Sequence, residues 1–232
     1  MTENIKPGST QPYTADEVYK NILRSIIKLQ FEPGQCISEN QMSQKYNVSR
    51  SVIRTAFTRL QQLRFIEIYP QRGTYISLID LNYLADLLVL RTAVEKEVIY
   101  EMFTSLEKKD RTSLVEALEA NLAEQEKCRD ERDYYGRFPR IDSAFHKTMI
   151  DSVGRYALVD LLSNNMLHIS RWRNFDVAFD HRIPQLIDQH RAVVEAIKDE
   201  NMLLAQKKMA EHLETISSIS GRAQAQFPNY FK

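Results

Sequence analysis

The pattern that most constrains the fold is a switch from helical to strand-like hydrophobic spacing within residues 14–78. Two segments in this stretch carry apolar side chains three and four residues apart, which is the spacing of one face of an α-helix, and a short helix is expected between them. Two shorter runs after them alternate in the manner of half-buried β-strands. A chain with this order of patterns is expected to form three short helices followed by a β-hairpin.

Each predicted helix begins at a polar start signal. The first follows residues 14–17, which have the composition of a capping box, and it carries a stripe formed by Val18, Ile22, Ile26 and Leu29. The second is expected from residue 38 or 39 to about residue 46. The third is expected over residues 50–63, with Ser49 as its N-cap.

The two strand-like runs, residues 65–69 and 74–78, are separated by Pro70-Gln-Arg-Gly73, which predicts a hairpin with a basic tip. Helix, helix, turn, helix and hairpin together are the order of a winged helix-turn-helix. A helix fits the major groove of DNA, and a hairpin of this kind can reach the adjoining minor groove. Residues 1–79 are therefore predicted to form a DNA-binding domain.

The distribution of charge supports this prediction. The formal net charge is zero, with 31 Lys and Arg against 31 Asp and Glu, which argues against a general polyelectrolyte binder. Residues 1–79 nevertheless hold 10 Lys and Arg against 6 Asp and Glu, and residues 49–64 hold four arginines and no acid. Arg50 and Arg54 lie one turn apart at the start of the third predicted helix. We therefore expect both to contact bases or phosphates of duplex DNA.

Residues 80–232 are predicted to form a second, all-helical domain. Long apolar periodicities predict helices near residues 81–106, 110–130, 133–153, 155–174, 181–199 and 202–226. No stretch approaches the roughly 20 apolar residues of a membrane-spanning helix. The N-terminus lacks a signal-like apolar run, and two cysteines are too few for a disulfide framework. A cytoplasmic protein without a membrane partner is expected.

One aspartate and three histidines stand out in this second half. Asp142 and His146 lie four residues apart, so both are expected on one helix face, beside the apolar residues Phe138, Phe145 and Met149. His190 and His212 each lie on an apolar stripe, about ten and eleven residues from a turn at residues 200–201, which places them at one height in a helical hairpin. A single buried histidine is most often structural. Four such residues on three helices favour a divalent metal site.

Two parts of the sequence resemble a known family. Residues 38–60, together with Gln71-Arg-Gly-Thr74, closely resemble the winged helix of GntR-family bacterial transcription regulators. The segments Asp142-x-x-Phe-His146, 189–197 and 205–213 resemble the ligand-binding FCD domain of FadR-type GntR regulators, and Arg91-Thr-Ala-Val-Glu95 matches its first helix. The expected fold class is mainly α: an N-terminal winged helix-turn-helix plus a C-terminal, FCD-like all-α helical bundle.

The resemblance implies roles for individual residues. The positions that approach DNA in the family correspond here to Ser49, Arg50, Ser51, Arg54 and Gly73. Metal-dependent members of the FCD group use one aspartate and three histidines as ligands, which correspond here to Asp142, His146, His190 and His212. Members that bind fatty acyl-CoA lack this set, so the resemblance implies a small carboxylate effector that completes the metal shell.

The sequence therefore predicts a DNA-binding transcriptional regulator rather than an enzyme, acting as a homodimer on operator DNA. Its metal is expected to be zinc, with nickel and manganese as the other possibilities. Arg91 and Arg171 are the cations expected to pair with the effector carboxylate. One alternative is a metal-dependent hydrolase, since such ligands can activate water, although no HExxH motif is present. Another is a regulator with a purely structural metal and a protein partner.

Overall fold

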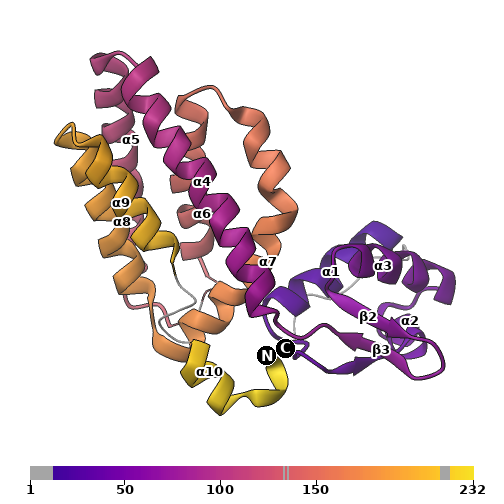
Figure 1. The fold of residues 1–232 in the computed structure, drawn as a ribbon. Helices are drawn as coiled ribbons and strands as arrows, with labels where there is room; N and C mark the ends of the chain where they lie inside the picture. Colours follow the sequence, from indigo (N-terminus) through magenta and orange to yellow (C-terminus); the bar gives the residue numbers. More distant parts are fainter. Residues whose placement is uncertain (1–12, 133, 135, 215–219) are drawn as a thin grey trace. The chain divides into compact units, whose positions relative to one another are not determined.

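The computed structural model describes residues 13–132, 134, 136–214 and 220–232. These residues form two compact units, seen as ribbons in Figure 1. The first contains the described residues up to Ile79 together with Phe227–Lys232, and the second is Asp80–Gln226. Residues 227–232 thus group with the N-terminal unit, whereas the predicted second domain includes them. The link is an isolated parallel β-bridge between Ile79 and Phe231.

The first unit has the order of elements predicted for a winged helix-turn-helix. Its helices are α1 (Ala15–Ile27), α2 (Glu39–Tyr46) and α3 (Arg50–Gln62), and its strands are β1 (Cys36–Ile37), β2 (Ile66–Tyr69) and β3 (Gly73–Ile76). A short 3-10 helix, η1 (Pro228–Tyr230), follows near the C-terminus. The strands form an antiparallel sheet in the order β1-β3-β2. The strand β1 is absent from the prediction because two residues are too few to show an alternating pattern.

The apolar faces of α1 and α3 form the core of this unit. Thr14 and Glu17 complete the predicted capping box at the start of α1. Fully buried side chains line the two helices: Val18, Ile22, Ile26, Ile53, Ala56 and Leu60. Leu29, predicted on the same stripe, lies beyond the end of α1 with a φ of 57°. Burial of this face of α3 leaves its opposite face exposed to solvent.

The strands β2 and β3 form the predicted hairpin. Tyr69 pairs with Gly73, so residues 70–72 form the tip. Gly73 has a φ of 116°, a conformation that is strained for any residue with a Cβ atom. The strand β3 ends at Ile76 rather than at residue 78, although the Ser77 amide still donates a hydrogen bond to the Phe65 carbonyl (3.0 Å).

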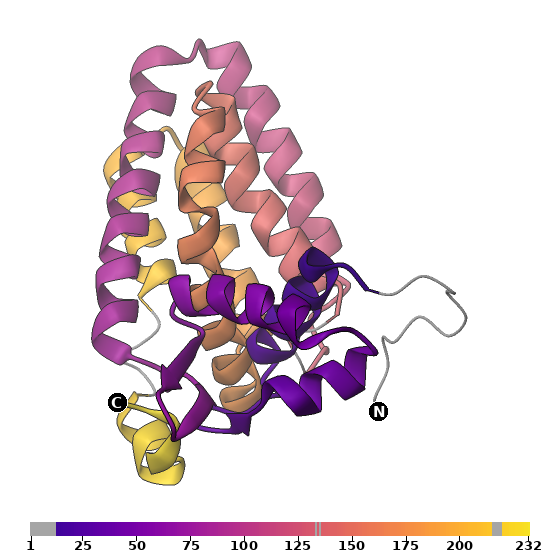
Figure 2. The ribbon, with the colours of Figure 1, turned by 90° about the vertical axis from the view of Figure 1, so that its right-hand side faces the viewer.

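The second unit is all-helical, as predicted. Its helices are α4 (Leu81–Ser105), α5 (Lys108–Glu126), α6 (Phe138–Ser152), α7 (Tyr156–Asp180), α8 (Ile183–Lys198), α9 (Met202–Leu213) and α10 (Ser220–Gln226). The views in Figures 1 and 2 show the long helices of this unit packed side by side. Among the described residues, no helix has both the length and the apolar character needed to cross a bilayer.

Three helices in this unit differ from the prediction by four residues or more at one end. The helix α5 ends at Glu126 rather than near residue 130. The helix α6 begins at Phe138, with Pro139 in its first turn, rather than at residue 133. The helix α7 continues six residues past its predicted end at residue 174, to Asp180. It ends where His181 adopts a left-handed conformation, with a φ of 50°. The last turns of α7 contain buried polar residues, which interrupt the apolar spacing from which helices are predicted.

The segment predicted as one helix over residues 202–226 contains two helices, α9 and α10. The helix α9 ends at Leu213 because Glu214 has an extended backbone, with a φ of −73° and a ψ of 101°. Residues 215–219, which fall inside the predicted helix, lie outside the described residues.

The main core of the second unit lies between α4, α5, α6, α8 and α9. It contains buried side chains from all five helices, including Ile99, Met102, Leu118, Phe145, Val193 and Met209. Burying one side chain of this size stabilises a fold by about 1.5–3 kcal/mol, so these contacts fix the orientation of the helices. The same packing removes several polar residues of α6, α8 and α9 from water.

Candidate metal centre and DNA-binding surface

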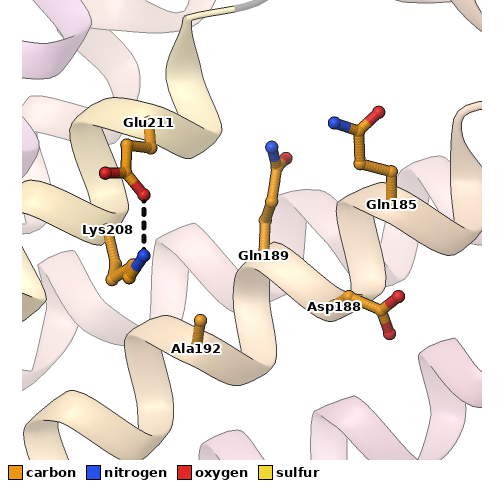
Figure 3. Close-up of a pocket in the computed structure, with 6 residues that line it drawn as sticks. All are labelled: Gln185, Asp188, Gln189, Ala192, Lys208 and Glu211. Carbon is orange, nitrogen blue, oxygen red and sulfur yellow. Dashed lines mark hydrogen bonds and ion pairs between the residues drawn. The ribbon is translucent and has the colours of Figure 1, made fainter.

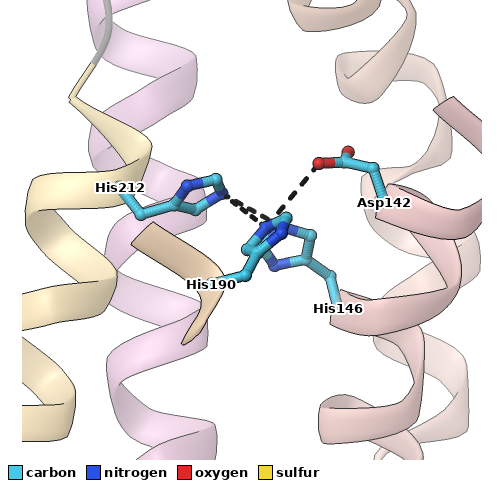
Figure 4. Close-up of side chains that lie close together, drawn as sticks. All are labelled: Asp142, His146, His190 and His212. Atoms are coloured by element: carbon cyan, nitrogen blue, oxygen red, sulfur yellow. Dashed lines mark hydrogen bonds and ion pairs between the residues drawn. The ribbon is translucent and has the colours of Figure 1, made fainter. Parts of the chain in front are cut away.

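Four buried side chains from three helices meet in the second unit. Asp142 and His146 come from α6, His190 comes from α8, and His212 comes from α9 (Figure 4). Each is at most 6% exposed. One ligand atom from each residue can be chosen so that all four atoms lie within 4.8 Å of one another. The helical spacing thus brings together the four residues selected from the sequence.

The three imidazole rings direct their Nε2 atoms at one another. The Nε2 atom of His190 lies 3.1 Å from that of His212 and 3.4 Å from that of His146. The His212 and His146 Nε2 atoms are 3.3 Å apart, and Asp142 Oδ1 lies 3.6 Å from His190 Nε2. A small volume is therefore surrounded by three ring nitrogens and one carboxylate oxygen.

The Nδ1 atom of each ring faces an oxygen atom outside the cluster. His146 Nδ1 lies 2.5 Å from Glu95 Oε2, His190 Nδ1 lies 2.8 Å from Gln125 Oε1, and His212 Nδ1 lies 3.3 Å from Gln189 Oε1. These oxygens accept hydrogen bonds, so Nδ1 carries a hydrogen in each ring, and in a neutral ring Nε2 then carries the lone pair. Such outer hydrogen bonds are the usual way in which proteins orient metal-binding histidines.

A chain of amides fixes the direction of the Gln125 hydrogen bond. Asn121 donates from Nδ2 to the Ile141 carbonyl (3.1 Å), and Gln125 donates from Nε2 to Asn121 Oδ1 (2.7 Å). A backbone carbonyl can only accept, so the chain has one polarity. The Gln125 Oε1 atom is therefore the end that faces His190, and the His190 tautomer follows from it.

The two oxygens of Asp142 have different surroundings. Oδ2 accepts a hydrogen bond from the Tyr134 hydroxyl at 2.9 Å. Oδ1 is buried and has no hydrogen-bond partner, although buried oxygens of this kind are nearly always bonded. Tyr134 thus holds one oxygen, and the other is left to act as a single ligand atom.

Burial and charge set the protonation of the cluster. Burial lowers the pKa of His190 to about 3, and it lowers that of His212 well below its ordinary value. Burial alone would raise the pKa of Asp142, but the neighbouring His190, His146 and Arg173 hold it below its usual value. Two neutral imidazoles beside an ionised carboxylate are in the states that metal ligands require.

The donor set fits a divalent transition metal. Imidazole nitrogen and carboxylate oxygen are ligands of zinc, nickel and manganese. Without a cation, three ring nitrogens and a carboxylate oxygen would face one another inside the protein. The unpartnered Asp142 Oδ1 and the convergent Nε2 atoms are both explained by an ion at their centre.

The two arginines predicted to bind effector have different places in the structure. Arg91 is buried and donates from Nε to Glu95 Oε1 (2.6 Å), so it supports the carboxylate that holds His146. Arg171 is buried, and burial lowers its pKa to about 9. A third arginine, Arg173, lowers the pKa of Asp142 more than Arg91 does.

Arg173 and the residues that hold the four candidate ligands were not predicted from the sequence. The supporting residues are Glu95, Gln125, Tyr134 and Gln189. Gln189 directly precedes His190, and Glu95 belongs to the Arg91–Glu95 pattern, so a search for partners of buried histidines would have found these two. Arg173 lies just before the predicted end of its helix, where no pattern marked it.

A surface groove of about 380 Å³ lies between α8 and α9. Figure 3 shows its lining residues, Gln185, Asp188, Gln189, Ala192, Lys208 and Glu211. An ion pair between Lys208 and Glu211 (2.9 Å) lies along one side. Gln189 also faces His212, so one lining residue of this groove contacts a candidate ligand.

The exposed face of α3 carries the predicted DNA-binding residues. Arg54 donates two hydrogen bonds of 3.0 Å to Glu39, and Arg50 donates a longer one of 3.3 Å to the same carboxylate. Both arginine side chains stay more than 60% exposed. Ser49 precedes α3 and its hydroxyl lies 2.8 Å from that of Ser51. This surface presents two cations, two hydroxyls and the start of a helix.

Comparisons with known proteins identify both units. Residues 14–76 match the family of bacterial regulatory proteins called the gntR family, and residues 86–215 match the FCD domain. The HTH-type transcriptional repressor RspR of Escherichia coli (strain K12) is 28% identical over 219 residues, which cover 94% of this chain and 92% of that protein. The HTH-type regulator YdhC of Bacillus subtilis (strain 168) is 24% identical over 212 residues, covering 90% of this chain and 92% of YdhC.

Solved structures show the same fold. A GntR regulator from Rhodococcus sp. RHA1 has a TM-score of 0.60 at 18% identity, over 94% of this chain and 99% of that one. E. coli McbR/YncC has a TM-score of 0.58 at 14% identity, over 91% and 99%. The relatives named here are regulators, which removes the reason to consider a metal-dependent hydrolase. The chain belongs to the GntR family of DNA-binding transcriptional regulators and carries an FCD domain as its C-terminal part.

Proposed function

We propose that this regulator binds operator DNA as a homodimer and that a small carboxylate, held at a divalent metal in the FCD domain, controls the binding. The observation that carries the metal proposal is the convergence of three Nε2 atoms on the unpartnered Oδ1 of Asp142. Asp142, His146, His190 and His212 would hold the ion. Zinc is the first candidate, with nickel and manganese as the alternatives.

A carboxylate effector follows from the chemistry of such a centre. Four protein ligands leave room on a five- or six-coordinate ion, and the bound metal would offer those positions to an oxygen ligand. The nearby buried cations Arg91 and Arg173 favour an anion as that ligand. An effector changes DNA binding only if it binds one conformation of the regulator better than another.

DNA binding is proposed for Ser49, Arg50, Ser51, Arg54 and Gly73. The exposure of both arginines and the placement of Gly73 at the wing support this assignment. A single recognition helix contacts only a few base pairs, so a two-fold dimer on an inverted repeat is the usual way to lengthen the site.

The metal proposal is tested by elemental analysis of protein purified without chelator. The wild type should contain about one divalent metal per chain, whereas a variant with both His146→Ala and His190→Ala should contain none. His168→Ala is the matched control, because this histidine packs edge-on against Tyr83 and lies outside the cluster. Metal should raise the free energy of unfolding by about 2.7 kcal/mol at a hundredfold excess over its Kd. Wild-type protein that neither contains nor binds any of the three metals would refute the proposal.

The DNA assignment is tested by gel-shift titration of Arg54→Ala on an operator fragment. If Arg54 contacts a base, the variant should lose about 1–3 kcal/mol of binding free energy. Arg155→Ala, in the second unit, removes an exposed arginine that pairs with Glu101 and serves as the control. Equal operator affinity for Arg54→Ala, Arg50→Ala and the wild type would contradict the assignment.

A further inference from the structure

Six residues that follow the helical unit in the sequence belong to the DNA-binding unit. Residues 227–232, here called the tail, group with the described residues up to Ile79. The region matched to the gntR family ends at residue 76, and the region matched to the FCD domain ends at residue 215. Neither match accounts for the tail, so its role has to be inferred from its contacts.

The tail completes the backbone hydrogen bonding of Ile79. The Ile79 amide donates to the Tyr230 carbonyl (2.8 Å), and the Lys232 amide donates to the Ile79 carbonyl (3.2 Å). Ile79 is 3% exposed, and it pairs with Phe231 in a parallel β-bridge. Buried backbone groups are nearly always paired, so Ile79 depends on the tail for both of these bonds.

Side chains of the tail contact further parts of the same unit. Phe231 is buried, and the Tyr230 hydroxyl is hydrogen-bonded to Glu32 in the loop before β1. The Lys232 Nζ atom lies 3.5 Å from Glu67 Oε1 on β2. This ion pair is exposed and stabilises little, so the buried ring and the backbone bonds provide most of the attachment. The tail thus contacts the loop before β1, the strand β2 and the segment after β3.

These contacts lie at the base of the wing, which is the hairpin formed by β2 and β3. The Ser77 amide donates to the Phe65 carbonyl at this base, and Ile79 follows two residues later. Nearer the tip, β1 supports β3 by pairing with Thr74 and Tyr75. A two-stranded hairpin is weakly held on its own, so the support at its base fixes its direction.

The tip of the wing carries an exposed cation. Arg72 lies in the turn between β2 and β3, and its guanidinium carbon is 5.9 Å from the centre of the Tyr69 ring. The Tyr75 hydroxyl donates a hydrogen bond to the Arg72 carbonyl (3.0 Å). Strands of this length extend about 13 Å, so a rotation of about 15° at the base moves the tip by about 3 Å. A displacement of that size breaks a contact with a phosphate.

We infer that the tail is a positioning element for DNA binding: it clamps the segment after the wing at Ile79 and so fixes the direction in which the wing presents Arg72 to DNA. The tail acts through the wing and is not itself placed on DNA. The inference rests on the DNA-binding part of the proposed function and needs neither the metal nor the effector. Because the tail directly follows α10, the helical unit is joined to the base of the wing at both of its ends.

Two substitutions release the tail by different means. Lys232→Pro removes the amide that donates to Ile79, and Lys232→Ala is its matched control because it keeps the amide. Phe231 already has the extended backbone that a residue before proline prefers, with a φ of −117° and a ψ of 154°. Phe231→Asp places a charge at a buried position, and Asn229→Asp adds the same charge at an exposed position of the tail.

Hydrogen exchange of the Ile79 amide in the full-length protein reports whether the tail is attached. We expect protection in the wild type and in both controls, and exchange about tenfold faster or more in Lys232→Pro and Phe231→Asp. Gel-shift titration on an operator fragment then measures the effect on DNA binding. Each tail variant should bind about threefold or more weakly than its control. In an Arg72→Ala background the same change should cost less than about twofold, because the wing contact is already lost.

Chemical probing of the complex separates positioning from folding. Protection of guanines from methylation reports contacts of α3 in the major groove, whereas hydroxyl-radical footprinting reports the backbone along the minor groove that the wing reaches. The tail variants should keep the first pattern and lose the protection made by the wing. A general loss of structure would remove both patterns together.

The outcomes distinguish this inference from the proposal on which it rests. The inference is wrong if the Ile79 amide exchanges freely in the wild type, or if both tail variants keep it protected. It is also wrong if variants with a released amide bind operator as tightly as their controls, lose both footprints together, or add their full loss to that of Arg72→Ala. In each of these cases operator binding by the wild type still supports the proposed function. If the wild type does not bind operator DNA, the proposed function itself fails.

Discussion

The amide chain behind His190 allows a sharp test of how the metal centre is preorganised. Gln125 is fully buried, and its Oε1 atom lies 2.8 Å from His190 Nδ1. Replacing it by leucine leaves the buried Nδ1–H without an acceptor and Asn121 Oδ1 without its donor. Each unsatisfied buried group costs about 1–3 kcal/mol. The His190 ring can escape part of that cost by moving its hydrogen to Nε2, which removes the lone pair that would bind a metal.

The expected consequence is a loss of metal affinity. Removing an outer-shell partner of a metal ligand typically lowers affinity by about 10–100-fold, which corresponds to about 1.4–2.7 kcal/mol at 25 °C. Gln125→Glu should keep most of the affinity, because a carboxylate also accepts from Nδ1. Gln206→Leu is the control, since that glutamine donates from Nε2 to the Lys96 carbonyl, away from the cluster.

The assay is zinc competition against a fluorescent chelator at pH 7.5, with nitrogen NMR of the histidine rings in metal-free protein as a second measurement. The spectra should show His190 as the Nδ1–H tautomer in the wild type and in Gln125→Glu. In Gln125→Leu, a detectable fraction should be the Nε2–H tautomer. Wild-type zinc affinity in Gln125→Leu, or equal losses in the leucine and glutamate variants, would refute this account of the amide chain.

Three further predictions concern pH, DNA selectivity and assembly. The pKa of His190 is lowered to about 3 and that of His212 is also lowered, so the unfolded chain binds protons more tightly at these two residues. Metal-free protein should therefore be less stable at pH 5 than at pH 7.5 in urea titrations. Equal stability at the two pH values would contradict the assignment of neutral His190 and His212 rings in the folded protein. Glu39→Gln removes the carboxylate that holds Arg54. The ratio of the affinity for operator DNA to the affinity for nonspecific DNA should therefore fall in gel-shift titrations. An unchanged ratio would show that Glu39 does not position the arginine. Sedimentation should give a dimer both free and on operator DNA, and a monomer in both states would exclude two-fold recognition.

The sequence was informative wherever a periodic pattern decided the structure. The stripes on α1 and α3 predicted the core of the first unit, and the turn at Gly73 predicted the hairpin. The four candidate ligands were also predicted from helical spacing. An i, i+4 spacing places two side chains on one helix face, and equal distances from a turn place two residues at one height in a helical hairpin, so no tertiary contacts need to be known. Their meeting within 4.8 Å is the result of that regularity.

The missed features depend on contacts between distant parts of the chain. Gln125 faces His190 from 65 residues away, and nothing in its local sequence marks a glutamine as a hydrogen-bond acceptor for a histidine. The end of α7 was missed because Arg173 and Asp176 are polar but buried, which interrupts the apolar pattern. Short strands such as β1 have no period to detect.

The positions of the histidines along the chain also bear on how the domain assembles. His146 and His212 are 66 residues apart, and His212 is the next-to-last residue of α9. An ion bound by both would cross-link α9 to α6 within the bundle, as a disulfide would, but a chelator could remove it. During synthesis the set is incomplete until the chain has reached His212, and a chain truncated before this residue would keep three of the four candidate ligands without the last one.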